Sequence, residues 1–191
     1  MPSPLLARVP PENLPDDIAT AHQASMALRG DATFFEVFGN HPELYRWYTG
    51  SFYGEVFRGG LVDRRLKELA RLRLSIEHGC RFCNQGNRVD ARDAGLTDSE
   101  IDAIGDFESG PFSAQEKAVL RLAEVMRLTN PDGMLERELH AALHEHFSDA
   151  EVLELGLVLG VLCGMAKFLF AFDLVEKEDN CPFGATSPDA R

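Results

Sequence analysis

Two cysteines separated by two residues, Cys80 and Cys83, are the side chains in this sequence with the clearest capacity for chemistry. They lie in SIEHGCRFCNQGNRVDARDAG, residues 75–95, a stretch with the composition of a helix. Because each helical residue advances by about 100°, their sulfurs would lie about 60° apart, on one face. Such a pair can be a redox dithiol, half of a zinc site, or two buried small residues. A zinc site needs two further ligands, and His140 and His144, four apart on one helix face, are the nearest match.

The residues next to the pair favour a reactive thiolate. Gly79 ends the preceding helical pattern, so Cys80 would lie near the N-terminus of a new helix. Unpaired backbone N–H groups and the helix dipole favour negative charge there, and Arg81 adds a positive charge. We therefore predict that Cys80 and Cys83 form an intramolecular disulfide under mild oxidation. Cys163 lies in the apolar run VLGVLCGM, so we expect it in the core.

The elements that must position these cysteines are predicted to be helices throughout. Apolar residues recur at helical spacing from one end of the chain to the other, whereas no segment shows the sustained alternation of a strand. Gly30 and the pair Gly59-Gly60 are helix stop signals, and Thr97 with Glu100 is the pattern of a capping box. The fold class is therefore predicted to be all-α.

Two apolar stretches of the sequence are interpreted as core. HPELYRWYTGSFYGEVFRGG, residues 41–60, places one set of apolar side chains on a single helical stripe: Leu44, Trp47, Tyr48 and Phe52. We interpret this stripe as a packed face rather than a ligand-stacking surface. LELGLVLGVLCGMAKFLFAFDLV, residues 153–175, is interrupted by three glycines and Lys167, so we predict a buried helix rather than a membrane span.

Length and composition bound the organisation and the partners. The 191 residues are enough for one domain. We place an N-terminal arm at residues 1–13, a single domain at 14–175 and a loosely ordered tail at 176–191. The formal net charge of -12 argues against nucleic acid or a membrane surface as a partner. Four cysteines without a secretion signal favour a reducing compartment, so we expect a cytoplasmic protein.

The sequence over about residues 41–105 resembles the AhpD-like alkyl hydroperoxidase and carboxymuconolactone decarboxylase superfamily. In that family a helix of the type RLKELARLRLS carries a glutamate, and Cys-x-x-Cys follows about a dozen residues later. Here Glu68 stands twelve positions before Cys80, and ARDAGLTDSEI matches the family's continuation after the cysteines. The resemblance implies a compact bundle of about seven to nine helices, assembled as a homotrimer or homohexamer and working without a cofactor.

The resemblance also implies roles for single residues. Cys83 would be the peroxidatic thiol, Cys80 the resolving thiol and Glu68 the base, with an external dithiol as electron donor. The family histidine, however, falls on Asn87, which cannot take up and release a proton at neutral pH. We therefore expect slow hydroperoxide turnover, and His78 is the nearest imidazole in sequence that could take part.

Glu68 has a second interpretation that does not depend on the family. On a charged helix it would be a solvated ion-pair partner of Arg64, Arg65 or Arg71.

Three functions remain open from the sequence. The first is a thiol oxidoreductase that reduces a hydroperoxide or another small oxidant through the dithiol. The second is a decarboxylase, isomerase or lactone-acting enzyme that uses the same scaffold on a small organic acid. The third is a redox sensor that reports oxidation without turnover. Only the first requires both reversible disulfide formation and turnover with a reductant.

Overall fold

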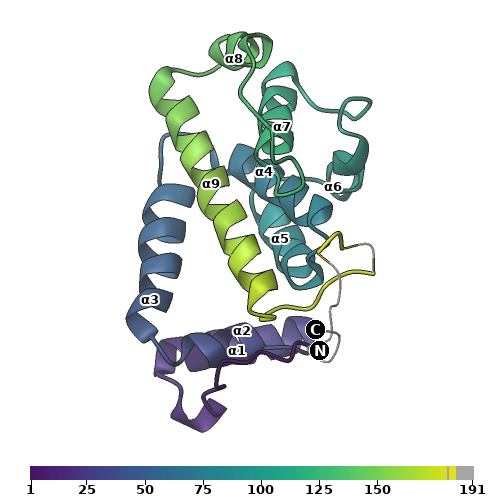
Figure 1. The fold of residues 1–191 in the computed structure, drawn as a ribbon. Coiled ribbons are helices and arrows are strands. Elements are labelled where there is room, and N and C mark those ends of the chain that lie inside the picture. The colour runs from purple at the N-terminus through teal and green to yellow at the C-terminus, as the bar shows by residue number, and fades with distance from the viewer. Residues whose placement is uncertain (180, 184–191) are drawn as a thin grey trace.

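The computed structural model describes residues 1–179 and 181–183 (Figure 1). All the regular structure in these residues is helical, which confirms the all-α prediction. The α-helices are α1 (Asp16–Arg29), α2 (Thr33–Phe38), α3 (Pro42–Arg46), α4 (Arg64–Glu77), α5 (Arg81–Asp93), α6 (Asp98–Ala103), α7 (Ala114–Met126), α8 (Arg137–His144) and α9 (Asp149–Ala171). They are supplemented by the short helices η1 (Pro11–Asn13) and η3 (Ile104–Asp106) and by the π-helix η2 (Trp47–Phe57).

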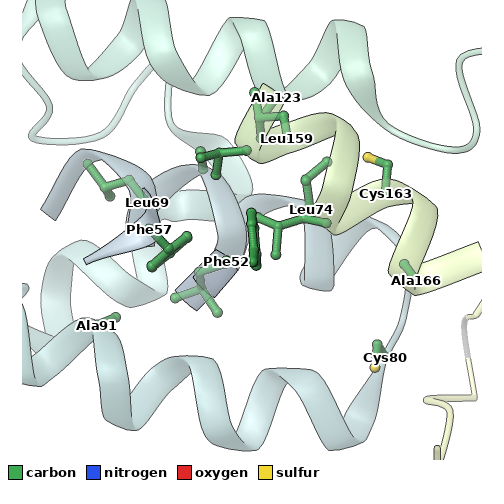
Figure 2. Close-up of a cluster of buried hydrophobic side chains, with 14 of the residues drawn as sticks. Phe52, Phe57, Leu69, Leu74, Cys80, Ala91, Ala123, Leu159, Cys163 and Ala166 are labelled. Carbon is green, nitrogen blue, oxygen red and sulfur yellow. The ribbon is translucent and has the colours of Figure 1, made fainter. Parts of the chain in front are cut away.

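Helix α4 is the centre of the fold and contacts α5, α7 and α9. Its residues Leu69 and Leu72 are fully buried, and Figure 2 shows Leu69 within the apolar cluster that α4 shares with α9. Charged residues of α4 are buried as well, because each finds a partner. Lys67, with no exposed surface, lies 2.6 Å from a carboxylate oxygen of Glu154 and donates to the carbonyl of Val56. The helix that precedes the cysteine pair is therefore held on several sides.

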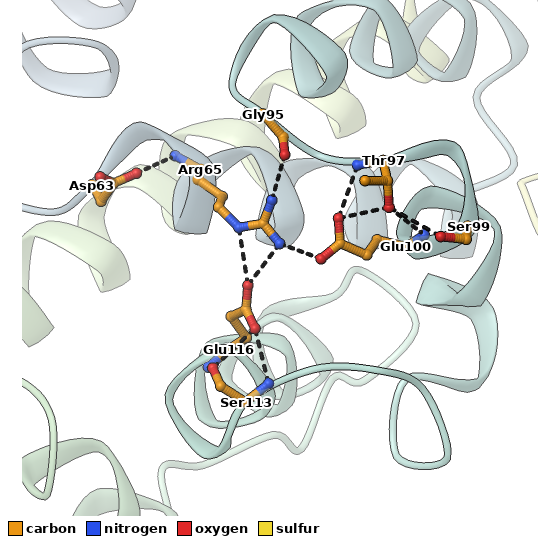
Figure 3. Close-up of polar contacts among 8 residues, drawn as sticks. All are labelled: Asp63, Arg65, Gly95, Thr97, Ser99, Glu100, Ser113 and Glu116. Atoms are coloured by element: carbon orange, nitrogen blue, oxygen red, sulfur yellow. Dashed lines mark hydrogen bonds and ion pairs between the residues drawn. The ribbon is translucent and has the colours of Figure 1, made fainter.

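Arg65 fixes the start of α4 to α6 and α7 (Figure 3). Its Nη2 lies 2.5 Å from Glu100 and 3.0 Å from Glu116. Each of these glutamates is the third residue of its helix and completes a capping box, Glu100 with Thr97 at α6 and Glu116 with Ser113 at α7. One guanidinium thus ties two helix starts to α4, and the capping box predicted at Thr97 is confirmed.

Helix α9 is apolar along most of its length but buried on one face only. Leu155 and Leu159 are fully buried, whereas Leu153 and Leu157 are 73% and 59% exposed. The helix is long and apolar enough to cross a membrane by length and composition, a test that core helices of soluble proteins also pass. The prediction of a buried core helix therefore holds for one side of α9.

The aromatic stripe predicted within residues 41–60 is only partly a packed face. Tyr48 and Phe52 are buried, but Leu44 and Trp47 are about half exposed, at 46% and 51%. The prediction was wrong for Leu44 because the buried residue of α3 is its neighbour Tyr45, and wrong for Trp47 because it assumed α-helical spacing beyond α3. Residues 47–57 form a π-helix, whose i→i+5 periodicity moves successive side chains to different faces. Tyr53, five residues after Tyr48, consequently lies beside it, with ring centroids 5.1 Å apart.

Part of the segment that we expected to be a loosely ordered tail, residues 176–191, lies against the cysteine turn. The backbone N–H of Glu178 donates to the carbonyl of Gly79 at 2.8 Å. Cys181 is buried, and its Sγ donates to the carbonyl of His78 at 3.0 Å. These contacts hold residues 176–179 and 181–183 because the turn at Gly79 leaves its carbonyls free for partners outside the helix. Residues 180 and 184–191 lie outside the described residues.

Candidate functional site

The cysteine pair lies at the turn between α4 and α5. Gly79 adopts a positive φ of 60°, which ends α4, and α5 begins two residues later at Arg81. Cys80 is the N-cap of α5, and its Sγ accepts a hydrogen bond from the backbone N–H of Cys83 at 3.2 Å. The two cysteines are joined in a disulfide with their Cα atoms 5.2 Å apart. The predicted pairing and the predicted place at a helix N-terminus are both confirmed, although Cys80 itself precedes the helix.

The disulfide lines a cavity of about 380 Å³ with a largely aromatic wall. The two cysteines of the disulfide differ in solvent access, since Cys80 is 1% exposed and Cys83 is half-buried. The wall is contributed by helices α2, α3, α5 and α9 and by η2, through Phe34, Phe35, Tyr45, Tyr48, Tyr53, Phe82, Leu162, Met165 and Leu169. A molecule in this cavity would be held by apolar contacts next to the Cys83 sulfur.

Glu68 is buried behind the cavity rather than exposed on a charged helix. It is 1% exposed, it pairs with Arg71, and it lies 3.3 Å from the Nε of Arg64. Both partners are among those predicted for it, but the prediction that the pair is solvated was wrong. Burial raises the pKa of the Glu68 carboxyl above its ordinary value, because the neighbouring Arg71 offsets the desolvation only in part and Asp90 adds negative charge.

Arg71 connects Glu68 to the cavity. Its Nη2 contacts the Glu68 carboxylate and lies 2.7 Å from Asp90, and both Arg71 and Asp90 line the cavity while Glu68 does not. The guanidinium also lies over the rings of Tyr53 and Phe57, at 5.5 and 5.0 Å from their centroids. The carboxylate exposed to a bound molecule is therefore that of Asp90.

Asn87 and His78, the other two predicted site residues, also line the cavity. Asn87 is 8% exposed and supplies an amide where the family has an imidazole. The His78 Nε2 accepts a hydrogen bond from the backbone N–H of Leu128 at 3.0 Å. Burial, with the nearby charge of Arg127, lowers the pKa of His78 to about 4. The imidazole is thus neutral at pH 7, with its proton on Nδ1.

Sequence reasoning missed several polar residues of the cavity, of which Asp90, Tyr53 and Arg29 matter most for its chemistry. Asp90 follows Cys83 by seven residues, two helical turns, so its spacing on α5 could have identified it. Tyr53 was hidden by the π-helix. Arg29, the last residue of α1, donates from Nε to the carbonyl of Phe82 at 3.1 Å and lies over that ring. No local pattern distinguishes Arg29, because a basic residue at a helix C-terminus is common.

The two histidines considered as zinc ligands do not line the cavity. His140 and His144 are neighbours on α8, with ring centroids 4.2 Å apart. Within residues 1–179 and 181–183, no group of three His, Cys, Asp or Glu side chains is arranged to hold a metal ion.

Comparison with known proteins finds relatives over much of the chain. The model of the carboxymuconolactone decarboxylase family matches residues 42–125. The uncharacterized protein YdfG of Bacillus subtilis is 31% identical over 99 residues, which are 51% of this chain and 67% of YdfG. An uncharacterized protein of Mycobacterium tuberculosis is 29% identical over 137 residues, or 63% of this chain. This chain spans about half the length of that relative, 48%.

Solved structures share the fold at low sequence identity. One is an uncharacterized peroxidase-related protein with an alkylhydroperoxidase AhpD core from Ralstonia eutropha, with a TM-score of 0.69 at 16% identity over 94% of each chain. Another is a variant of the debrominase Bmp8 in complex with 2,3,4-tribromopyrrole, with a TM-score of 0.70 at 16% identity over 93% of each chain. These structures show the fold, and the family match together with the relative YdfG shows the family. The chain belongs to the carboxymuconolactone decarboxylase family and has its AhpD-like helical fold.

Proposed function

We propose that this protein is a thiol-dependent oxidoreductase that reduces a hydroperoxide through Cys80 and Cys83. The two thiols supply two electrons, so that one hydroperoxide and one dithiol give one alcohol, one water molecule and the disulfide. The observation that carries the proposal is the Cys80–Cys83 disulfide in the wall of an aromatic cavity. Membership of a family of enzymes supports catalysis in general.

Access assigns different steps to the two sulfurs. Cys83 is the half-buried one and lines the cavity, so its thiolate attacks the outer oxygen of the hydroperoxide and releases the alcohol. Cys80 then attacks the resulting sulfenic acid, water leaves, and the disulfide closes. Because Cys80 is 1% exposed, an external dithiol donor attacks Cys83 when it restores the reduced state, and the Cys80 sulfur leaves.

The proton needed by the departing alkoxide is the one that the Cys83 thiol loses, and the Asp90 carboxylate or a water molecule on the polar side of the cavity passes it on. Asp90 is the carboxyl group that a bound molecule can contact, and Glu68 acts from behind by holding Arg71 in place. This assignment differs from the family pattern, in which the glutamate is the base. Asn87 orients the substrate or a water molecule by hydrogen bonds, since an amide cannot transfer a proton.

Peroxide consumption by paired serine variants tests the proposal. With cumene hydroperoxide and a panel of dithiol donors, Cys83→Ser abolishes turnover because the attacking sulfur is gone. Cys163→Ser is the matched control, since Cys163 is buried in α9 and donates to the carbonyl of Met126, which a serine hydroxyl also reaches. Peroxide turnover that survives in Cys83→Ser contradicts the proposal, and a parent protein that consumes no peroxide favours a decarboxylase or isomerase that does not need the thiols.

Reduction of a halogenated aromatic ring is a second candidate, favoured by the six aromatic side chains of the cavity wall and by the fold shared with a debrominase. The same dithiol would replace bromine by hydrogen and release bromide and a proton as the disulfide forms. Bromide release from 2,3,4-tribromopyrrole, absent in Cys83→Ser, would support it. Peroxide turnover without bromide release selects the first function.

A further inference from the structure

Arg29 places a positive charge in the cavity; Asp90 and Asp31 attract it, but no carboxylate of the described residues lies within ion-pair distance of it. Its Nε donates to the carbonyl of Phe82, and its Nη1 lies 3.4 Å from the hydroxyl of Ser25. Both acceptors are uncharged, and Nη2 makes no hydrogen bond within residues 1–179 and 181–183. Arg71, in contrast, is paired with both Glu68 and Asp90.

The position of this guanidinium depends on two neighbours in α5. It lies over the ring of Phe82, with 4.4 Å from Cζ to the ring centroid. Gly86 leaves the room that the group occupies, because a Cβ at that position would lie 1.9 Å from Nη2 of Arg29. Phe82 stands between the two cysteines in sequence, so these contacts hold the charge beside the disulfide.

The charged residues that line the cavity are three arginines and one aspartate: Arg29, Arg58, Arg71 and Asp90. Asp90 is paired with Arg71, which is also paired with the buried Glu68. The remaining positive charges, Arg29 and Arg58, lie over aromatic rings. A cavity with an excess of positive charge in a chain of net charge -12 attracts an anion locally, against the sign of the whole molecule.

We propose that Arg29 forms an anion subsite that selects ligands with an apolar, aromatic-sized body and a carboxylate head. The body fills the aromatic part of the cavity, and the carboxylate accepts hydrogen bonds from the free N–H groups of the planar guanidinium. For the proposed reaction, the preferred substrate is then a hydroperoxide that also carries a carboxylate. That last step rests on the proposed function, whereas binding of the carboxylate does not.

Binding to the oxidised protein tests the subsite without turnover. The probes are phenylpropionate and its neutral amide, phenylpropionamide, which have nearly the same shape, measured by calorimetry or by NMR titration. We expect the parent protein to bind the acid about 10-fold or more tightly than the amide, because a charge-assisted hydrogen bond replaces a neutral one. Equal affinities, or no binding of either probe at millimolar concentration, would overturn the proposal.

Variants locate the preference at Arg29. Arg29→Met removes the charge and should bring the acid-to-amide ratio close to one, while Arg29→Lys should keep part of it. Gly86→Ala keeps the charge but displaces the guanidinium, so it should also reduce the ratio. Arg121→Met is the control, since Arg121 is exposed and paired with Glu108 outside the cavity. A ratio unchanged in Arg29→Met overturns the proposal.

Kinetics separate this role from a direct effect of Arg29 on the thiolate. The substrates are cumene hydroperoxide carrying a para-carboxylate and its methyl ester. Arg29→Met should raise KM for the acid about 10-fold or more relative to KM for the ester, whose kinetics report any general effect of the substitution on the site. An equal loss for acid and ester would mean that Arg29 stabilises the Cys83 thiolate and would overturn the subsite. A parent protein that shows no peroxide turnover but still prefers the acid would contradict the proposed function and support the subsite.

Discussion

Asn87 is the cavity side chain that fits the proposed reaction least, because the reaction needs a proton transfer that an amide cannot supply. It lines the cavity and is almost buried, so its amide is placed to contact a bound molecule. An amide donates and accepts hydrogen bonds but does not ionise near neutral pH. Proton transfer to the alkoxide is consequently left to Asp90 or to water. We expect this step to be slower than it would be with an imidazole at position 87.

Asn87→His should raise the rate of hydroperoxide reduction, by up to about 10²-fold, because general acid catalysis typically contributes that much or more. Initial rates with cumene hydroperoxide and excess dithiol measure the effect. Gln85→His is the matched control, since Gln85 is on the same helix but is not part of the cavity wall. An unchanged rate with the fold intact would show that Asn87 serves substrate binding instead of replacing a proton relay.

His78 gives the protein a pH-dependent stability. Its pKa falls from 6.5 to about 4 on folding, so the unfolded chain binds a proton in this range that the folded chain does not. The free energy of unfolding should therefore decrease as pH falls from 6.5 toward 4, by about 3 kcal/mol at most. In His78→Gln, whose amide oxygen can still accept from Leu128, the decrease should be smaller by that amount. Denaturant unfolding at several pH values measures it, and equal pH slopes for both proteins would contradict the assignment.

At the scale of elements, the turn between α4 and α5 depends on Gly79 for two reasons. Its φ is 60°, and a Cβ there would lie 2.6 Å from the Cα of Cys181. Gly79→Ala should therefore both strain the backbone and push the segment around Cys181 away. Gly95→Ala separates the two effects, because Gly95 also has a positive φ, 88°, but open space where its Cβ would be.

We expect Gly95→Ala to cost about 1 kcal/mol of stability from backbone strain, and Gly79→Ala clearly more. Only Gly79→Ala should make Cys181 react with an alkylating reagent in the folded protein, as mass spectrometry of digested samples would show. Similar costs for both variants, with Cys181 still protected, would mean that residues 176–179 and 181–183 are not held by this turn.

The sequence predicts the elements around the site better than it predicts the site itself. Gly79 and the capping box at Thr97 are local signals, so the break before the cysteines and the start of α6 are both as expected. The face of η2 was not predictable, because a π-helix has no distinct sequence signature that separates it from an α-helix. The contacts of Arg29 with Phe82 and of Arg71 with Asp90 join different helices, and spacing within one helix does not encode them.

Across the whole molecule, large apolar side chains remain exposed on α9 and on η2. Leu153 and Leu157 of α9 are mostly exposed, and Trp47 at the start of η2 is half exposed. Exposed apolar surface on a long helix is typical of a subunit interface. It is consistent with the homotrimer or homohexamer that we expect from the family resemblance.

Light scattering at micromolar concentration should therefore give a mass about three or six times the 21.2 kDa of the chain. Leu157→Glu should shift the assembly toward smaller species, because it places a charge on the exposed face of α9. Glu145→Gln, an exposed position near α8, serves as the control. A parent protein that scatters as a single chain would contradict the oligomer.

The most direct test of the account is the stoichiometry of one turnover. The fully reduced protein is mixed without air with one equivalent of cumene hydroperoxide, and both the alcohol formed and the thiols lost are counted by chromatography and by alkylation with mass spectrometry. We expect one alcohol for every two thiols lost, with the lost thiols at Cys80 and Cys83 and with Cys163 unchanged. Alcohol formed without loss of these two thiols, or thiols lost without alcohol, would contradict the proposed reaction.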